Sequence, residues 1–253
     1  MLDPNLNLNG VTFAYGRGRP VLSELTLEFT AGATLLLGPN GAGKSTLLGL
    51  CASTLSPRRG LVAANGTPAA GADLRAFRSV VSLMPQQIQS VPGLTVREQV
   101  AYAGWLKGMS KQSAWERSLD CLSRVDLVAL ADRRPRTLSG GELRRVGVAQ
   151  AIVHGAEWLL LDEPTAGLDP AQRAHFQELI GGLRREVNIV ISTHQTEDIG
   201  SSYEAVLVLN EGRVTFTGTT EDFLARGDGA PGSNELVVSS YLRALESSPA
   251  SST

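Results

Sequence analysis

The sequence predicts an α/β fold built on a mainly parallel, buried β-sheet, and three observations lead to this prediction. The apolar runs at residues 34–37, 158–161 and 189–191 are uninterrupted, which is typical of parallel strands covered on both faces. A glycine-rich segment, residues 38–46, directly follows the first run and leads into a helix-like stretch. Polar and acidic side chains follow the other two runs, so they should gather at the edge of the sheet where ligands bind.

The glycine-rich segment fills every fixed position of a phosphate-binding loop. Glycines lack a Cβ, so several backbone N–H groups can approach a β-phosphate, and the following helix start adds a partial positive charge. A chance glycine turn before a core helix is the structural alternative. The predicted loop comprises Gly38, Pro39, Asn40, Gly41, Ala42, Gly43, Lys44, Ser45 and Thr46. Within it, Lys44 would reach the β and γ oxygens, and the Ser45 hydroxyl would ligate Mg²⁺.

Length and composition narrow the class of protein. A chain of 253 residues can form one sizeable α/β domain with an inserted subdomain. A net charge of -2 offers no basic field, so no nucleic-acid partner is expected. Cys51 and Cys121 match no metal spacing and should be small buried hydrophobes in a reducing compartment. No apolar run approaches the roughly 18 residues that cross a bilayer, and no signal segment opens the chain, so we expect a cytosolic protein.

The N-terminal region alternates apolar and polar residues, which predicts antiparallel, half-buried strands at residues 6–15 and 25–29. A short strand should follow at residues 61–63, and another at residues 80–84 ends just before Gln86. Tyr15 closes the first pattern. Its position alone favours packing in the core, and a ring on which a base stacks is the alternative.

A helical subdomain is predicted between strands of the main sheet, at about residues 87–150. Residues 95–98 form a capping box, and apolar residues then recur at helical spacing. Residues 113–116 have the same pattern and predict a second box. Trp105 and Trp115 are expected to form the core of this subdomain rather than a ligand platform.

A third helix in this region begins after a serine and two glycines, which leave free N–H groups at a positive helix end. From sequence alone, Ser139, Gly140, Gly141 and Glu142 form either an ordinary helix cap or a second anion site. The spacing does not show whether this helix start meets the phosphate loop.

Two acidic residues, Asp162 and Glu163, end the strand at residues 158–161. Successive strand side chains point to opposite sides, so one carboxylate can hold Mg²⁺ while its neighbour faces the γ-phosphate. A solvated acidic turn is the alternative. Asp169 is predicted to cap the next helix, and His194 follows the last buried strand, where position alone does not decide between a functional and a structural role.

Residues 206–209 and 214–217 are predicted to pair as strands, and residues 221–226 to form a short helix. The predicted domain therefore covers residues 1–225. Residues 226–253 should contain a flexible joint at 227–233, a helix at 235–246 and a disordered tail from 247.

Over about residues 5–225, these segments resemble the ATP-binding subunit of an ATP-binding-cassette (ABC) transporter. Seven elements occur in the order of that family: Tyr15 as the aromatic loop, Gly38 to Thr46 as the phosphate loop, Gln86 as the Q-loop, Leu138 to Glu142 as the signature, Asp162 with Glu163, Asp169 in the D-loop, and His194 as the switch histidine. A kinase or GTPase would share only the phosphate loop and an acid. Glu142 stands where many members have glutamine, and glutamate is a familiar variant.

The resemblance implies ATP and Mg²⁺ as cofactors and revises the expectation for Tyr15, which would stack on adenine. It implies that the helix start at residues 139–141 contacts the γ-phosphate bound to the opposite subunit, in a head-to-tail dimer with itself or a homologous ATPase subunit. Gln86 would join the Mg²⁺ and water network and move with the helical subdomain, which in the family docks on an integral membrane subunit.

By this resemblance, ATP is hydrolysed by in-line attack of water on the γ-phosphate. The implied catalytic residues are Lys44, Gln86, Glu163 and His194. The implied metal-binding residues are Ser45, Gln86 and Asp162. Nucleotide contacts come from the phosphate loop, Tyr15, the signature residues through Glu142, and Asp169.

The leading functional prediction is the energising subunit of a membrane transporter, held at the inner face of the membrane by its partner. Residues 92–98 and the compact end after Phe223 look most like the drug and antibiotic exporter branch. An importer subunit has the same motifs and is the first alternative. A soluble ABC ATPase of translation or DNA maintenance is the second, although such proteins usually carry two cassettes or long coiled-coil arms.

Overall fold

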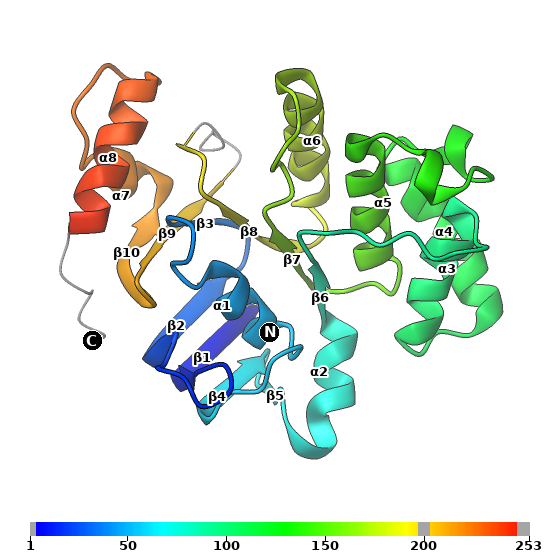
Figure 1. The fold of residues 1–253 in the computed structure, drawn as a ribbon, viewed down its shortest axis with the longest axis horizontal. Helices are drawn as coiled ribbons and strands as arrows, with labels where there is room; N and C mark the ends of the chain where they lie inside the picture. The colour runs from blue at the N-terminus through cyan, green and yellow to red at the C-terminus, as the bar shows by residue number, and fades with distance from the viewer. Residues whose placement is uncertain (1–3, 197–202, 247–253) are drawn as a thin grey trace.

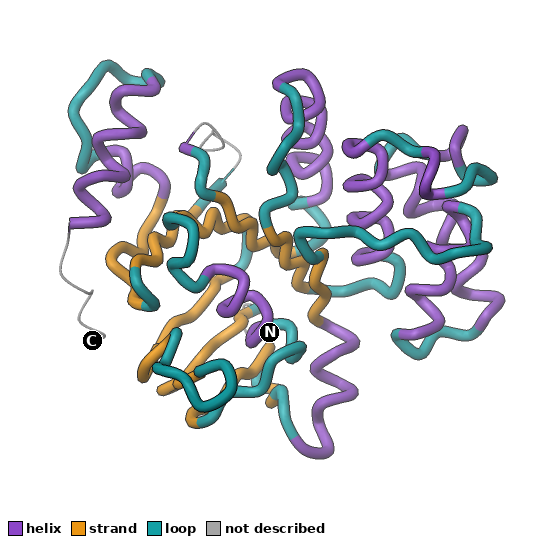
Figure 2. The backbone as a smooth tube through the Cα atoms, viewed as in Figure 1, coloured by secondary structure: helices purple, strands orange, loops and turns teal. Residues whose placement is uncertain are grey.

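A computed structural model describes residues 4–196 and 203–246 of the chain. Its main sheet crosses the middle of the molecule in the order β10-β9-β3-β8-β7-β6 (Figures 1 and 2). All neighbours in it pair in parallel except β10, which runs antiparallel to β9. The strands are β3 (Ala33–Leu37), β6 (Val81–Met84), β7 (Trp158–Asp162), β8 (Asn188–Thr193), β9 (Ala205–Asn210) and β10 (Arg213–Thr219). The predicted mainly parallel α/β core is confirmed.

The central strands are buried on both faces, as their uninterrupted apolar runs predict. In β3, the side chains of Leu35 and Leu37 pack on one face of the sheet, in a cluster that includes the helical subdomain. The side chain of Leu36 packs on the opposite face. Leu159 and Leu160 of β7 divide in the same way. Because successive side chains point to opposite sides, an apolar strand of this kind joins two separate cores.

A second, antiparallel sheet has the order β2-β1-β4-β5. It comprises β1 (Asn5–Phe13), β2 (Leu22–Thr30), β4 (Arg59–Ala64) and β5 (Thr67–Pro68). The helix α1 (Lys44–Cys51) lies between the two sheets, where Leu47 and Leu48 share a core with Leu8 of β1 and Leu36 of β3 (Figure 1). This sheet confirms the predicted antiparallel N-terminal subdomain.

The helix α1 is shorter than expected, because the sequence suggested a helix as far as about Leu55. Ser53 has a left-handed backbone with φ of 55°, and the N–H groups of Thr54 and Leu55 both turn back to the carbonyl of Gly49. These bonds satisfy a carbonyl of the last turn and end the helix.

The predicted helical subdomain is present beside the β6 edge of the main sheet (Figure 1). Its helices are α3 (Val96–Leu106), α4 (Lys111–Arg124) and α5 (Gly140–Ile152). The helix α2 (Leu74–Val80) precedes β6, and short 3₁₀ turns are η1 (Gly71–Asp73), η2 (Val128–Leu130) and η3 (Pro135–Thr137).

One of the two predicted capping boxes in this subdomain is correct and the other is wrong. Thr95 and Glu98 bond reciprocally at the start of α3. Ser113 does not begin α4, because Ser110 is the cap and its hydroxyl accepts the N–H of Ser113. Ser110 lies three residues before Ser113, so α4 begins about one turn earlier than predicted.

The expectation that both tryptophans are core residues is also wrong. Trp105 is 46% exposed and Trp115 is 43% exposed. Trp105 follows Gly104, which occupies the buried face of α3, so its ring points outward and stacks on Tyr102. The guanidinium of Arg97 lies 3.8 Å from the ring centroid of Trp115.

The remaining helices are α6 (Pro170–Leu183), α7 (Thr220–Leu224) and α8 (Asn234–Glu246). The C-terminal helix α8 packs on α7, β9 and β10, where Ala244 is fully buried. In the preceding segment, the Asp228 N–H donates to the Ser239 hydroxyl of α8 at 2.8 Å. The tail predicted from residue 247 lies outside the described residues, and the domain boundary at 225 stays a prediction.

Within residues 4–196 and 203–246, no helix combines the length and the apolar character that crossing a bilayer requires.

Candidate active site

The phosphate loop connects β3 to α1, and two of its glycines are required by the backbone. A Cβ on Gly38 would lie 2.3 Å from the carbonyl oxygen of Leu209, so β9 leaves no room for a side chain. Gly43 has φ of 105°, a left-handed conformation that favours glycine, and it is the N-cap of α1. The loop therefore has the tight curl that a phosphate cradle needs.

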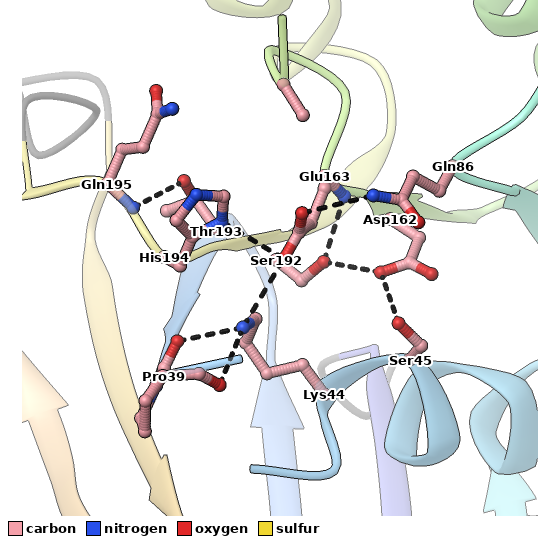
Figure 3. Close-up of polar contacts among 12 residues, drawn as sticks. Pro39, Lys44, Ser45, Gln86, Asp162, Glu163, Ser192, Thr193, His194 and Gln195 are labelled. Carbon is pink, nitrogen blue, oxygen red and sulfur yellow. Dashed lines mark hydrogen bonds and ion pairs between the residues drawn. The ribbon is translucent and has the colours of Figure 1, made fainter. Parts of the chain in front are cut away.

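Lys44 is the first residue of α1, and its side chain turns back across the loop (Figure 3). Its Nζ donates to the carbonyl oxygens of Gly38 at 2.8 Å and Pro39 at 3.2 Å, and lies 3.4 Å from Glu163 Oε1. Burial lowers the pKa of this ammonium, while the Glu163 and Asp162 carboxylates oppose that change. These contacts hold the lysine beside the acids.

Asp162 ends β7 and is buried. Its Oδ1 accepts hydrogen bonds from Ser45 at 3.1 Å and from Ser192 at 2.8 Å (Figure 3). A hydroxyl and a carboxylate side by side are hard oxygen ligands that suit Mg²⁺, which is typically bound by one or two carboxylates together with substrate phosphates. The described residues contain no group of three or more His, Cys, Asp and Glu that could form a metal site from protein ligands alone. The donors present fit Mg²⁺ held jointly with a nucleotide.

Glu163 is contacted by three side chains from three different elements (Figure 3). Besides Lys44, the Gln86 amide donates to Oε2 at 3.3 Å, and His194 Nδ1 lies 3.2 Å from Oε1. Glu163 has φ of 45°, which is unusual for a residue with a side chain, and its N–H donates to the Ser192 hydroxyl at 3.0 Å. This strained turn aims the carboxylate at the residues that follow β6 and β8.

Tyr15 lies next to the phosphate loop rather than in the core. Its ring is 56% exposed and meets Phe13 edge-on, and its hydroxyl is 3.1 Å from Thr46 Oγ1. The first expectation from position alone, a core residue, is therefore wrong. An exposed ring tethered to the start of α1 is available to stack on a base.

The signature segment forms a capping box at the start of α5. Ser139 accepts the Glu142 N–H, and the Glu142 carboxylate accepts the Ser139 N–H, which lowers the Glu142 pKa. Asp169 caps α6 by accepting the Gln172 N–H, as predicted. Across residues 4–196 and 203–246, no hydrogen bond or ion pair joins residues 139–142 to the phosphate loop.

Two residues of the site were not anticipated from the sequence. Ser192 is fully buried and bonds both acids, and the parallel register that places it opposite Asp162 could have identified it. Arg144 of α5 donates to the carbonyl oxygens of Gln86 and Ala166. It has no comparable sequence signal, because these contacts depend on how α5 packs against two loops.

The fold and the site define a P-loop nucleotide-binding protein. A glycine loop joins a buried strand to a helix, and a lysine is held beside two acids at the carboxyl edge of a parallel sheet. The sequence profile of the ABC transporter family matches residues 22–166. Two curated relatives are each 37% identical to the chain. The methionine import ATP-binding protein MetN of Caulobacter vibrioides aligns over 217 residues, 83% of this chain and 65% of MetN. The cobalt import ATP-binding protein CbiO of Rhodobacter capsulatus aligns over 229 residues, 88% of this chain and 82% of CbiO.

Solved structures agree with this assignment. The cbiO1 protein of Clostridium perfringens, described as part of the transporter complex cbiONQ, superposes with a TM-score of 0.77 at 27% identity, covering 88% of this chain and 92% of cbiO1. The ATP-binding cassette MJ0796, solved as a dimer bound to ADP and Pi, has a TM-score of 0.75 at 26% identity, covering 85% of this chain and 98% of the cassette. The chain belongs to the ABC transporter family and is an ATP-binding ATPase of that family.

Proposed function

We propose that the chain binds ATP with Mg²⁺ at the site described above and hydrolyses it by in-line attack of water on the γ-phosphate. The observation that carries this proposal is the convergence of Lys44, Gln86 and His194 on Glu163, one residue after the carboxylate that bonds Ser45. Phosphoryl transfer needs positioned charges more than covalent chemistry, and this site supplies them.

Each side chain then has one task. Ser45 and Asp162 would hold Mg²⁺, which would neutralise negative charge on the bound triphosphate. Lys44 releases Glu163 and turns to the γ-phosphate oxygens. Glu163 orients the attacking water and, as the base, takes its proton while the water oxygen bonds to the γ-phosphorus and the bond from that phosphorus to the oxygen of the departing ADP breaks. Gln86 and His194, which bond that carboxylate from two sides, hold the water and the γ-phosphate in line.

We also propose that two subunits, identical or homologous, close head-to-tail over two ATP molecules. The start of α5, at Ser139 and Gly141, and the first turn of α6, at Ala171 and Gln172, line a cavity of about 270 Å³, and both helix starts present positive ends. These features suit the γ-phosphate of ATP bound by a partner. The dimeric cassette MJ0796 supports the same assembly.

Sedimentation velocity tests this arrangement. The variant Glu163→Gln should sediment at twice the monomer mass in saturating Mg-ATP and as a monomer in Mg-ADP. The double variant Glu163→Gln, Ser139→Arg should stay monomeric in both, because a large cation replaces the cap at the proposed contact. A monomer in Mg-ATP, with the membrane partner also present, would contradict the proposed dimer.

The transport partner is proposed to be a separate integral membrane protein, which would hold this subunit at the inner face of the cell membrane. A groove of about 1130 Å³ runs between the core and the helical subdomain, lined by Arg75, Ile88, Leu106 and Lys107 among others. Leu106 is 63% exposed and suits a helix presented by a membrane protein. The description of cbiO1 as part of a transporter complex supports a partner of this kind.

Affinity capture from detergent-solubilised membranes tests the partner. The chain should recover a multispanning protein, and Leu106→Asp should lose it. Leu242→Asp, a change at a similarly exposed leucine of α8, should keep it. Recovery of ribosomes or DNA without a multispanning protein would instead indicate a soluble ABC ATPase.

For the direction of transport, the sequence at residues 92–98 favours export. Import is the second candidate, because MetN and CbiO are both named as import proteins. Everted membrane vesicles containing the assembled transporter separate the two. An exporter accumulates substrate inside such vesicles on addition of ATP, whereas an importer releases substrate from preloaded ones.

A further inference from the structure

The arginine at position 144 lies on α5, two residues after the capping box, and reaches two segments of the catalytic site. One terminal nitrogen, Nη1, donates to the carbonyl oxygen of Gln86, and the other, Nη2, donates to the carbonyl oxygen of Ala166 at 3.3 Å. The planar fork of a guanidinium suits two acceptors in different directions. Burial lowers the pKa of this group, while the Glu163 and Asp162 carboxylates oppose that change, so the acids act electrostatically on the cation.

Both carbonyls held by Arg144 belong to residues that in turn contact Glu163. The Gln86 side chain donates to the Glu163 carboxylate, and the Ala166 N–H donates to the Glu163 carbonyl at 3.2 Å, closing the turn that follows β7. Arg144, Gln86, Glu163 and Ala166 therefore form a closed ring of hydrogen bonds. One side of the ring is on the helical subdomain and the other is on the core.

The segment after Gln86 is also attached to the helical subdomain further along. Gln99 of α3 is fully buried, and its amide accepts the Val91 N–H at 2.7 Å and donates to the Gln89 carbonyl at 3.1 Å. Residues 86–91 are thus tied to this subdomain at both ends. Arg144 extends the attachment to the turn that carries Glu163, through its hydrogen bond to the Ala166 carbonyl.

We propose that Arg144 is a positioning residue that couples the orientation of α5 to the geometry of Glu163, through the backbone of Gln86 and of Ala166. A shift of α5 would then move two things together: the Gln86 amide, which bonds the Glu163 carboxylate, and the turn closed by Ala166, which orients that carboxylate. This inference rests on the proposed roles of Gln86 and Glu163 in hydrolysis.

Hydrogen exchange and steady-state kinetics on the purified chain test the coupling together. In Arg144→Gln, amides of residues 85–91 and 163–168 should exchange about 10-fold faster, and kcat should fall about 10-fold with KM for ATP changed less than about threefold. The control is Arg97→Gln, because Arg97 of α3 donates to the carbonyl oxygen of Trp115 and the hydroxyl of Ser118 on α4, both within the helical subdomain. This control variant should leave the exchange rates of residues 85–91 and 163–168 unchanged, and it should also leave kcat and KM unchanged.

A third variant, Arg144→Lys, keeps the charge and serves if Arg144→Gln does not fold. In Arg144→Lys, the ATPase turnover rate and the amide exchange rate should change together. If the amides of residues 85–91 and 163–168 exchange faster, kcat should be lower, and if they exchange at the parental rate, kcat should be parental. Faster exchange with parental turnover, or slow turnover with parental exchange, would overturn the proposal. Absence of hydrolysis by the parental protein would count against the proposed function instead, since the exchange result does not depend on it.

Discussion

At the scale of the residue, Glu163 is the group on which hydrolysis should depend most. Glu163→Gln keeps the size and the hydrogen-bonding reach of the side chain but removes its negative charge and basicity. We expect kcat to fall by about 10²–10⁴-fold, with ATP affinity retained. Steady-state ATPase assays and a titration with labelled ATP measure the two effects, and the exposed Glu178→Gln of α6 is the control. Hydrolysis at the parental rate would show that Glu163 is not the base.

Ser192 should matter for a different reason, because its hydroxyl bonds Asp162 and the N–H of Glu163 at once. Ser192→Ala leaves that buried N–H without a partner, which typically costs about 1–3 kcal/mol in the free energy of unfolding. We expect urea denaturation to show this loss, together with lower turnover at limiting Mg²⁺. The buried Ser82→Ala on β6 is the matched control. Unchanged stability and metal dependence would contradict this role.

The sequence predicts residues whose role follows from local spacing and misses those whose role follows from packing. Asp162 and His194 lie at the carboxyl ends of buried strands, and Lys44 is joined to such a strand by the glycine loop, so their meeting at one edge could be anticipated. Tyr15 could not be placed by alternation, because the chain leaves β1 at Phe13 and the pattern no longer applies. Arg144 could not be anticipated at all, since nothing local distinguishes it from the arginine beside it.

At the scale of the element, the start of α5 combines a stabilising cap with a proposed contact to the partner. Ser139→Ala should lower the free energy of unfolding by about 1 kcal/mol and also weaken the Mg-ATP-dependent dimer of Glu163→Gln. Thr95→Ala in the equivalent box of α3 should cost a similar amount without affecting the dimer. Urea denaturation and sedimentation velocity provide the two readouts. Equal effects of both changes on the dimer would point to a general loss of helix stability.

Element types were predicted well where periodicity was strong and caps were unambiguous. The buried strands β7 and β8 and the capping box of α3 are found as expected. The predicted start of α4 was wrong because Ser110 rather than Ser113 is the cap. The predicted end of α1 was wrong because hydrogen bonds back to the Gly49 carbonyl end the helix early. The outward tryptophans show that small residues can occupy the buried face of a helix: Gly104 does so beside Trp105, and Ala114 and Ser118 do so beside Trp115.

At the scale of the whole molecule, stability should depend on pH through His154, which follows α5. Burial lowers its pKa from 6.5 to about 4, and the nearby charges of Lys107 on α3 and Arg117 on α4 act in the same direction. Neither ring nitrogen has a hydrogen-bond partner in the part of the chain that the structure describes. Between these two pKa values the unfolded chain binds the proton and the folded chain does not, so stability decreases as pH falls from about 6.5 towards 4.

Urea denaturation at several pH values measures this dependence. The His154 contribution should reach a slope of up to about 1.4 kcal/mol per pH unit, and His154→Phe should remove that contribution. His175→Gln is the control, since His175 lies 3.5 Å from Asp126 and is 43% exposed. A parental slope in His154→Phe would show that other groups cause the acid sensitivity.

The pairing of Glu163 with Lys44, Gln86 and His194 also determines how substitutions at these positions should combine. The three partners share a single carboxylate. Removing one of them changes the surroundings of the other two, so the effects of single substitutions are not expected to add. Double-mutant cycles are therefore needed to separate the contribution of each partner.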